Sequence, residues 1–395
     1  MKKIAFVLPP FLPLPPVRGG AMETLVNYLL LHNEKNHDFD FTVFGVEDGE
    51  AKKAEKAYRH TRFQTVSAKK RFAALDSYYV RGMRKLFKIE ISPERQYLKR
   101  LLKQLVQEAF DTIIVENQIA FVRPIEKAVG KKNVVLHLHN KFLFGGIRCG
   151  EKILAACEGV LAVSDFIRRD VLTLPCDAPQ KVMVLPNCVD TERFDSGKCQ
   201  SQREEIRSRF GIEPDETVIL YSGRLLREKG IVELVEAFSA LKEPKVKLMI
   251  VGSSWYGSDA GTPFVEELRR LTEPVANRIL FTGFVPYENM PAYYAAADIC
   301  TLPSYMEASP LSVLEALACG RPIVVSDAGG IPENVTEACA VTVSRGPDMV
   351  QELTRAFALL AGDEVLRRRM GEAGRKFVQN RDPGSYYRRF KELMD

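Results

Sequence analysis

Short apolar runs recur along the whole chain, and each is followed by a longer stretch with the spacing of an amphipathic helix. In the first half these runs occupy residues 4–8, 41–44, 112–115, 134–138, 160–163 and 182–185. Continuous apolar strands that alternate with helices indicate a parallel sheet covered on both faces. The first half is therefore expected to be a doubly wound α/β domain.

The same pattern starts again in the second half. Apolar runs occupy residues 218–221, 248–251, 279–281, 299–302 and 323–325. Residues 186–214, between the two halves, are polar and rich in turn formers, as an interdomain connection is. A length of 395 residues suits two domains. We predict Rossmann-like domains at 1–190 and 191–379 that face each other across a cleft, with ligands beyond the carboxyl ends of the strands.

Composition places the chain among ordinary globular proteins, with 46% apolar and 27% charged residues. Its apolar runs are far shorter than the roughly 20 residues that span a bilayer. Lys2 and Lys3 lead directly into a strand pattern and not into a secretory leader. A cytoplasmic protein is expected. The eight cysteines have no C-x-x-C spacing, so neither a zinc site nor a disulfide framework is indicated.

Positive charge is concentrated in one segment of the first half. Residues 51–105 contain 16 Lys and Arg against 4 Asp and Glu, a net charge of +12, so the rest of the chain carries −7 of the total of +5. Aromatic residues lie among these bases. The segment fits an anionic membrane surface at the inner face of the cell membrane or a polyanionic acceptor, and it equally fits the solvated faces of one or two helices.

The most informative motif covers residues 304–325 and has the order strand end, loop, helix, strand. Ser309 is expected to cap the helix and Pro310 to be its first residue, while Gly320 ends it after about ten residues. Free backbone amides near Leu311 and Ser312, at the positive end of the helix dipole, would bind a diphosphate.

Two glutamates accompany this helix, Glu307 in the preceding loop and Glu315 inside it. Carboxylates do not hold phosphate, but they accept strong hydrogen bonds from sugar and ribose hydroxyls. We therefore expect both to bind the sugar part of a ligand. The alternative is a loop surface charge and a charge on a helix face.

A second motif, at residues 221–230, lies directly after a strand and before an amphipathic helix. Gly223 permits a tight turn, and Arg224 and Lys229 would hold two phosphoryl groups without a metal ion. The segment matches neither the P-loop nor G-x-G-x-x-G, so kinase and dehydrogenase functions lose support. An ordinary surface turn is the alternative.

Two histidines end a strand of the first half on the same face, and His139 is nearer the carboxyl end than His137. His139 is the candidate for the cleft, whereas His137 is expected to be buried and structural. Asp38 and Asp40 form a D-x-D pair, but it precedes a strand and is not expected to bind metal. The proline-rich residues 8–16 are interpreted as a stiff loop after the first strand.

The two main motifs together resemble the family 4 glycosyltransferases, which have the GT-B fold. The resemblance rests on Ser222-Gly223-Arg224 with Lys229-Gly230, and on Glu307-x7-Glu315. Further segments fall in the order of the family over nearly the whole chain: 18–20, 187–194, 283–285 and 329–333. One departure is that Glu307-Ala308-Ser309-Pro310 replaces the commoner Glu-Gly-Phe-Gly.

The resemblance implies retaining transfer from a nucleotide sugar, usually a UDP-sugar, with no cofactor and no metal. The implied catalytic residues are His139, Arg224, Lys229 and Glu307. The implied donor-binding residues are Gly19, Gly20, Gly223, Gly283, Val285, Ala308, Ser309, Leu311 and Glu315. In this scheme Glu315 binds the ribose, Glu307 and His139 contact the sugar, and the 283–285 backbone contacts the base. The resemblance also implies a last helix, about 380–395, that returns to the first domain.

Several functions stay open beside this one. The expected acceptor is a glycan or lipid-linked molecule in the synthesis of a cell-surface polysaccharide or glycoconjugate, and no nucleic acid is expected. A non-catalytic accessory subunit that binds nucleotide sugars and a sugar-nucleotide epimerase of the same fold are the alternatives. A phosphorylase would need a pyridoxal lysine, and no residue marks one.

Overall fold

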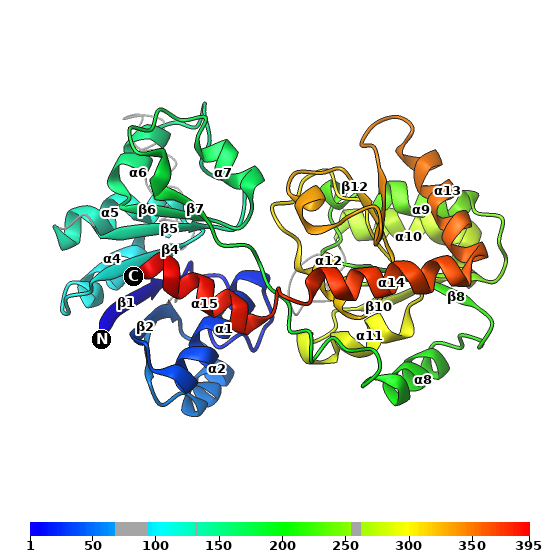
Figure 1. The fold of residues 1–395 in the computed structure, drawn as a ribbon, viewed down its shortest axis with the longest axis horizontal. Helices are drawn as coiled ribbons and strands as arrows, with labels where there is room; N and C mark the ends of the chain where they lie inside the picture. The colour runs from blue at the N-terminus through cyan, green and yellow to red at the C-terminus, as the bar shows by residue number, and fades with distance from the viewer. Residues whose placement is uncertain (68–93, 131–132, 254–261) are drawn as a thin grey trace. The chain divides into compact units, whose positions relative to one another are not determined.

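The computed structural model describes residues 1–67, 94–130, 133–253 and 262–395, which form two compact units (Figure 1). The N-terminal unit comprises Met1–Pro186 and the final residues Tyr386–Asp395. The C-terminal unit comprises Asn187–Ser385. Each unit is an α/β domain with one parallel sheet, as the alternation of strands and helices predicts.

The sheet of the N-terminal unit has the order β3-β2-β1-β4-β5-β6-β7, and all neighbours run parallel. Its strands are β1 (Lys2–Val7), β2 (Phe39–Val46), β3 (Thr61–Val66), β4 (Thr112–Glu116), β5 (Val134–Leu138), β6 (Gly159–Ala162) and β7 (Val182–Val184). Six of these strands match predicted runs. The edge strand β3 was not predicted, because its sequence TRFQTV mixes polar and apolar residues and is only partly buried.

Helices connect these strands on both faces of the sheet. They are α1 (Ala21–Asn36), α2 (Gly49–Ala54), α4 (Arg95–Leu105), α5 (Ile119–Val129), α6 (Gly150–Ala156), α7 (Asp165–Val171) and α15 (Pro383–Met394), with short 3-10 turns η1 (Glu55–Ala57) and η2 (Pro179–Lys181).

The last helix, α15, belongs to the core of the N-terminal unit from Tyr386 onward, beside β2 and α1 (Figure 1). The ring of Phe390 packs 6.1 Å from that of Phe6 and 6.2 Å from that of Phe41. The Tyr387 hydroxyl shares its one proton between Asn33 Oδ1 at 2.9 Å and Asp38 Oδ2 at 3.0 Å. Burial of these aromatic side chains stabilises the packing of α15 against the sheet of the N-terminal unit.

The sheet of the C-terminal unit has the order β10-β9-β8-β11-β12-β13 and is also parallel throughout. Its strands are β8 (Thr217–Ser222), β9 (Val246–Val251), β10 (Ile279–Gly283), β11 (Ile299–Leu302), β12 (Ile323–Ser326) and β13 (Ala340–Val343). Five match predicted runs. The edge strand β13 was not predicted, because its sequence AVTV is interrupted by a threonine and is only partly buried.

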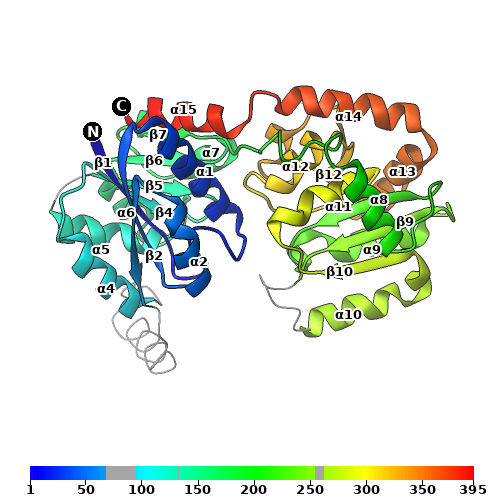
Figure 2. The same cartoon turned by 90° about the horizontal axis from the view of Figure 1, so that it is seen from below.

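Helices cover both faces of this sheet, and Figure 2 shows α10 and α14 on opposite sides of it. The helices are α8 (Gln200–Arg209), α9 (Ile231–Ala240), α10 (Pro263–Thr272), α11 (Met290–Ala296), α12 (Leu311–Ala318), α13 (Met349–Gly362) and α14 (Glu364–Val378). The 3-10 turns are η3 (Arg227–Lys229), η4 (Glu273–Arg278), η5 (Tyr287–Asn289) and η6 (Ile331–Asn334).

The strand order of each sheet reverses once. The reversal lies between β1 and β4 in the N-terminal unit and between β8 and β11 in the C-terminal unit. Ligands of open α/β sheets bind beyond the carboxyl ends of the strands at such a point. The loops that follow β1, β4, β8 and β11 are therefore where a site is expected.

None of the helices that the structure describes is long and apolar enough to cross a membrane. All eight cysteines lie among the described residues, and none forms a disulfide.

Candidate functional site

Lys229 and Glu307 meet in the C-terminal unit, at the point where the strand order reverses. Lys229 ends η3 after β8, and Glu307 lies in the loop after β11. The Lys229 Nζ donates to Glu307 Oε1 at 2.7 Å, and the Ser304 hydroxyl donates to the same oxygen at 2.7 Å. The two charged side chains are only 16% and 11% exposed. Residues 78 positions apart in the sequence thus form one partly buried ion pair.

Backbone contacts hold the two loops together. The Tyr305 amide donates to the Glu228 carbonyl at 2.9 Å. Gly230 has a left-handed φ of +67°, and a Cβ there would lie 1.9 Å from the Pro303 carbonyl oxygen. Only glycine permits this approach, which brings Lys229 within reach of Glu307.

Three predicted donor-binding residues, Gly223, Gly283 and Val285, lie at or just after the carboxyl ends of neighbouring strands. The Gly223 amide donates to the Val251 carbonyl at 3.1 Å, and the Gly252 amide donates to the Gly283 carbonyl at 2.9 Å. The ends of β8, β9 and β10 are thereby joined, which places Gly283 at the same edge of the sheet as Gly223. Val285 follows two residues later.

Arg224 differs from Lys229 in its exposure and pairing. Its side chain is 38% exposed, and its Nη2 lies 3.9 Å from Glu228 Oε1, at the limit of an ion pair. Its backbone carbonyl accepts a 2.8 Å hydrogen bond from the buried Tyr221 hydroxyl. The backbone of Arg224 is therefore anchored, while its guanidinium extends into solvent.

The start of α12 differs from the prediction by one residue. Pro310 is the N-cap, with an extended backbone and no side-chain capping bond, and Leu311 is the first helical residue. Ser309 does not cap the helix, because its hydroxyl accepts from Asn334 at 3.4 Å and its carbonyl accepts from Asn187 at 2.7 Å. The helix has eight residues, two fewer than expected. Ala308 and Leu311 are both buried.

Glu315 lies inside α12 and is 6% exposed. Its Oε2 accepts a 2.8 Å hydrogen bond from the Tyr294 hydroxyl. Burial raises the pKa of Glu315 to about 7, although Tyr294, Tyr287 and the charge of Arg193 oppose the shift. The carboxyl is thus poised between its neutral and ionised forms near neutral pH. Its described partners are tyrosines and not members of the Lys229 group.

Sequence reasoning missed Tyr287, Tyr294 and Arg193. The Arg193 guanidinium lies 4.9 Å from the centre of the Tyr287 ring. Arg193 belongs to the 187–194 segment, whose place in the family order was recognised, so that segment was the available signal. The tyrosines carry no motif, and only their packing against α12 relates them to Glu315.

In the N-terminal unit, Gly19 and Gly20 precede α1 with φ values of +76° and +110°. A Cβ on Gly20 would lie 2.1 Å from the Glu23 carboxylate. Burial, together with the nearby charge of Glu116, raises the pKa of Glu23 to about 7, although a backbone hydrogen bond opposes the shift. The glycine loop therefore covers a buried carboxyl that is partly neutral at physiological pH.

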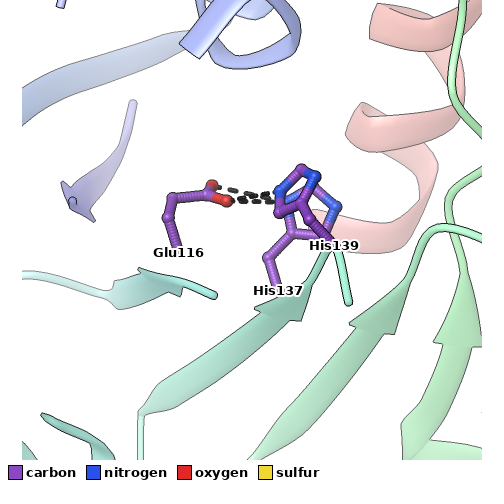
Figure 3. Close-up of side chains that lie close together, drawn as sticks. All are labelled: Glu116, His137 and His139. Atoms are coloured by element: carbon purple, nitrogen blue, oxygen red, sulfur yellow. Dashed lines mark hydrogen bonds and ion pairs between the residues drawn. The ribbon is translucent and has the colours of Figure 1, made fainter. Parts of the chain in front are cut away.

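Glu116, at the end of β4, joins both histidines at the end of β5 (Figure 3). His139 Nε2 lies 2.9 Å and His137 Nδ1 3.1 Å from Glu116 Oε2. The His139 amide also donates to the Asn117 side chain at 3.0 Å. His137 is fully buried, whereas His139 is partly accessible.

The protonation of this cluster follows from burial and from its own hydrogen bonds. Burial disfavours the ionised form of Glu116, yet the imidazoles reverse this effect and lower its pKa to about 2. Burial and the neighbouring His137 lower the pKa of His139 to about 4. An ionised carboxylate only accepts hydrogen bonds, so the ring nitrogens that face it carry protons. His139 is then neutral at pH 7, and its Nδ1 carries no proton and can accept a hydrogen bond.

Among the described residues, Glu116, His137 and His139 also form the one group whose donor atoms are close enough to hold a metal ion, within 4.8 Å of one another. However, His137 Nε2 is buried and finds no hydrogen-bond partner within the described ranges of the chain. A histidine that binds metal normally donates its other N–H to a second partner. The contacts therefore fit a hydrogen-bonded cluster better than a metal centre.

The D-x-D pair is occupied by structural contacts. Asp38 pairs with Lys391 and accepts from Tyr387, both on α15. Asp40 lies on β2 and pairs with Arg62 at 3.3 Å.

Comparison with known protein families agrees with these motifs. The model described as Glycosyltransferase Family 4 matches residues 22–193, and the model described as Glycosyl transferases group 1 matches residues 202–377. The chain belongs to the family 4 glycosyltransferases.

Full-length relatives of this glycosyltransferase have varied names. It is 27% identical to the GDP-mannose-dependent alpha-(1-6)-phosphatidylinositol monomannoside mannosyltransferase of Mycolicibacterium smegmatis, over 92% of this chain and 91% of the relative. It is 25% identical to spore coat protein SA of Bacillus subtilis, over 96% and 95% of the two chains. A structure of Anabaena Alr3699/HepE in complex with UDP has a TM-score of 0.77 at 19% identity and covers 100% of this chain and 99% of that one. The glycosyltransferase therefore has the GT-B fold.

Proposed function

We propose that this glycosyltransferase moves a sugar from a nucleoside diphosphate donor, a UDP-sugar, with retention of anomeric configuration. The observation that carries the proposal is the Lys229–Glu307 pair at the reversal point of the C-terminal sheet. A cation for phosphate and a carboxylate for sugar hydroxyls meet there, beside the amino end of α12.

The departing diphosphate is held by Arg224, Lys229 and the first amides of α12 at Leu311. In the absence of ligand, Glu307 neutralises Lys229 at 2.7 Å. A donor phosphate takes over the ammonium group of Lys229, and Glu307 then accepts from a hydroxyl of the sugar. Fixed charges that stabilise the leaving group supply much of the rate acceleration in such sites.

The rest of the donor binds at neighbouring positions in this proposal. Glu315 accepts from the ribose hydroxyls, and the backbone at Gly283 and Val285 contacts the base. Gly19 and Gly20 approach the phosphates. Backbone amides at Ala308 and Ser309 border the sugar. His139, neutral and held by Glu116, offers an acceptor to a sugar hydroxyl.

Support for the nucleotide comes from the relatives. Alr3699/HepE has been solved with UDP and with UDP-glucose, whereas the mycobacterial relative is named as GDP-mannose-dependent. Retention follows the family, and the leaving phosphate oxygen takes the proton of the acceptor hydroxyl. The acceptor is a lipid-linked or glycan molecule of a cell-surface polysaccharide or glycoconjugate.

Release of nucleotide from UDP-glucose, UDP-N-acetylglucosamine and GDP-mannose tests the proposal. Arg224→Ala and Lys229→Ala should each lower the rate by about 100-fold or more, as loss of one charge-stabilising donor does. Arg227→Ala is the matched control, because Arg227 lies in the same turn, is 63% exposed and pairs with Glu267. Wild-type rates in both site variants would contradict the proposal, and binding without any release would favour an accessory subunit.

The proposed donor site uses no metal, because Arg224, Lys229 and the helix end balance the charge of the diphosphate. EDTA should therefore leave the rate unchanged. A strict requirement for Mg²⁺ in the same assay would show that side chains alone do not activate the donor.

A further inference from the structure

A polar cavity of about 600 Å³ lies in the C-terminal unit, at the opposite edge of the sheet from Lys229 and Glu307. It reaches the amino ends of three strands, at Thr217, the first residue of β8, at Asp298 before β11 and at Pro322 before β12. Helices α8 and α14 contribute its other walls. Nothing in the proposed transfer reaction uses this edge.

Most carboxylates of the cavity wall already have basic partners. Asp298 pairs with Arg203 at 2.9 Å and with Arg207 at 3.2 Å. Glu364 pairs with Arg368 at 3.1 Å. The two remaining pairs join Asp215 to Lys245 and Glu216 to Lys247.

Three arginines of the wall have no carboxylate partner within ion-pair distance among the described residues. Arg321 Nη2 donates to the Ala295 carbonyl at 3.0 Å, and Arg367 Nη1 donates to the Leu360 carbonyl at 2.6 Å. Arg375 Nη2 donates to the Ser196 hydroxyl and to the Cys319 carbonyl. The carbonyls belong to the last turns of α11, α13 and α12, so helix ends fix one edge of each guanidinium.

Among the described residues, each of these guanidiniums donates through a single terminal nitrogen, although a guanidinium has five N–H donors. The Arg321 Nε is buried and has no hydrogen-bond partner in the part of the chain that the structure describes. Burial also lowers the pKa of Arg321, and the charge of Arg203 adds to this effect. A buried cation of this kind is costly unless an anion accompanies it.

The charge balance of the wall favours an anion. After the pairs above are set aside, Arg321, Arg367 and Arg375 face one remaining carboxylate, that of Glu372. Guanidinium groups bind phosphate through paired N–H donors. The volume is in the range of about 300–1,000 Å³ that is typical of small-molecule sites, larger than a phosphate ion needs.

We propose that this cavity binds a phosphate group, with Arg321, Arg367 and Arg375 as its ligands. The phosphate comes either from inorganic phosphate or from a small phosphomonoester whose hydroxyls fill the rest of the cavity. The site is independent of the donor site, because the two lie at opposite ends of the same strands.

Isothermal titration of the full chain with inorganic phosphate, ribose 5-phosphate and uncharged ribose tests the proposal. Phosphate and ribose 5-phosphate should bind, and ribose should not. If ribose 5-phosphate binds more tightly than inorganic phosphate, the ligand is a phosphomonoester. If the two bind with equal affinity, the ligand is inorganic phosphate. Arg367→Gln and Arg375→Gln should each weaken binding at least tenfold.

Arg368→Gln is the matched control, since Arg368 is on the same helix, is 72% exposed and already pairs with Glu364. It should retain wild-type affinity. Glu372→Gln removes the opposing carboxylate without disturbing a helix end, and it should tighten binding several-fold even if the arginine variants fold poorly. Lys229→Ala should leave phosphate binding unchanged. Absence of binding, or binding that Lys229→Ala abolishes and Glu372→Gln does not alter, would overturn the proposal.

Discussion

Lys229, in the loop after β8, and Glu307, in the loop after β11, form an ion pair with each other. Glu307 Oε1 accepts from both Lys229 and Ser304, so the lysine already has an anionic partner. A partly buried ion pair costs solvation, and its geometry is retained only when further hydrogen bonds support it.

Glu315 predicts a pH dependence of stability. Burial raises its pKa from the ordinary 4.5 to about 7, so the folded state holds this proton more tightly than the unfolded chain does. The contribution to stability is full below pH 4.5 and is lost as the pH rises through about 7, and the difference amounts to about 3 kcal/mol. Glu315→Gln should therefore gain thermal stability relative to wild type between pH 5 and pH 8.

Melting temperatures at both pH values measure this effect. Glu228→Gln is the control, because Glu228 is 60% exposed and should show no such change. Parallel curves for Glu315→Gln and wild type would show that the buried carboxyl does not titrate in this range.

Substitution of Glu116 is expected to leave the His139 ring without a fixed orientation. Glu116→Gln removes the ionised acceptor that holds both rings, which should destabilise the unit by about 2 kcal/mol. It should also lower nucleotide release at least tenfold, because His139 loses its fixed tautomer. Nitrogen NMR shifts of the imidazoles check the cause: wild-type His139 should carry its proton on Nε2 and stay neutral until the pH approaches 4.

A second hydrogen-bonded carboxylate of the same unit gives the control. Glu34 accepts from the Arg59 amide at 2.7 Å and from the Thr61 hydroxyl at 2.8 Å, near β3. Glu34→Gln should cost stability without changing nucleotide release. An unchanged His139 tautomer in Glu116→Gln would mean that Glu116 does not position this ring.

At the scale of elements, the strands differed in how well they could be predicted, and the difference follows their burial. A strand buried on both faces, such as β8 with its sequence TVILYS, gives a continuous apolar run. The strands β3 and β13 are only partly buried and give no such run, whereas β7 and β10, which also lie at sheet edges, match predicted runs. The cap of α12 was misplaced for a different reason, because tertiary hydrogen bonds to Asn334 and Asn187 occupy the oxygens of Ser309.

At the junction between η3 and the loop after β11, adding one methyl group to Gly230 is expected to weaken nucleotide binding strongly. Gly230→Ala forces a left-handed alanine and a 1.9 Å contact with the Pro303 carbonyl, so the two loops must separate. Nucleotide affinity should fall at least tenfold. Gly211→Ala is the control, because Gly211 has a φ of +59° but nothing within 4 Å of a new Cβ.

Calorimetry and nucleotide titration separate the two glycines. Gly211→Ala should cost only the left-handed backbone, about 1 kcal/mol, and should bind nucleotide normally. If Gly230→Ala also binds normally, the close approach of the loops is not needed for the donor site.

At the scale of the whole molecule, charge is distributed unevenly. The basic residues 51–105 lie partly outside the described residues, but α4 is described and has two distinct faces. Tyr97, Leu98, Leu101 and Leu105 are buried. The opposite face exposes bases, namely Arg95, Lys99, Arg100 and Lys103. Each base of such a face that lies near an anionic lipid surface contributes about 1 kcal/mol to the free energy of binding.

Binding to anionic liposomes should therefore weaken as salt rises, because the attraction is screened within about 10 Å at 0.1 M salt. A Lys99→Glu, Lys103→Glu double variant should bind less. Arg388→Glu, on α15, gives a comparison with a base outside this segment. Liposome binding that is independent of salt would refute the electrostatic contact.

The sequence by itself determined the parallel sheets, the two-domain organisation, the family and the residues of the two main motifs, because buried strands and glycine turns leave local patterns. The tertiary structure decided which groups meet: Lys229 with Glu307, Glu315 with Tyr294, and Glu116 with both histidines. It also revealed the arginine cavity, whose residues lie on separate segments between 196 and 375. Contacts between distant segments depend on strand order and loop approach, and neither leaves a periodic signal in the sequence.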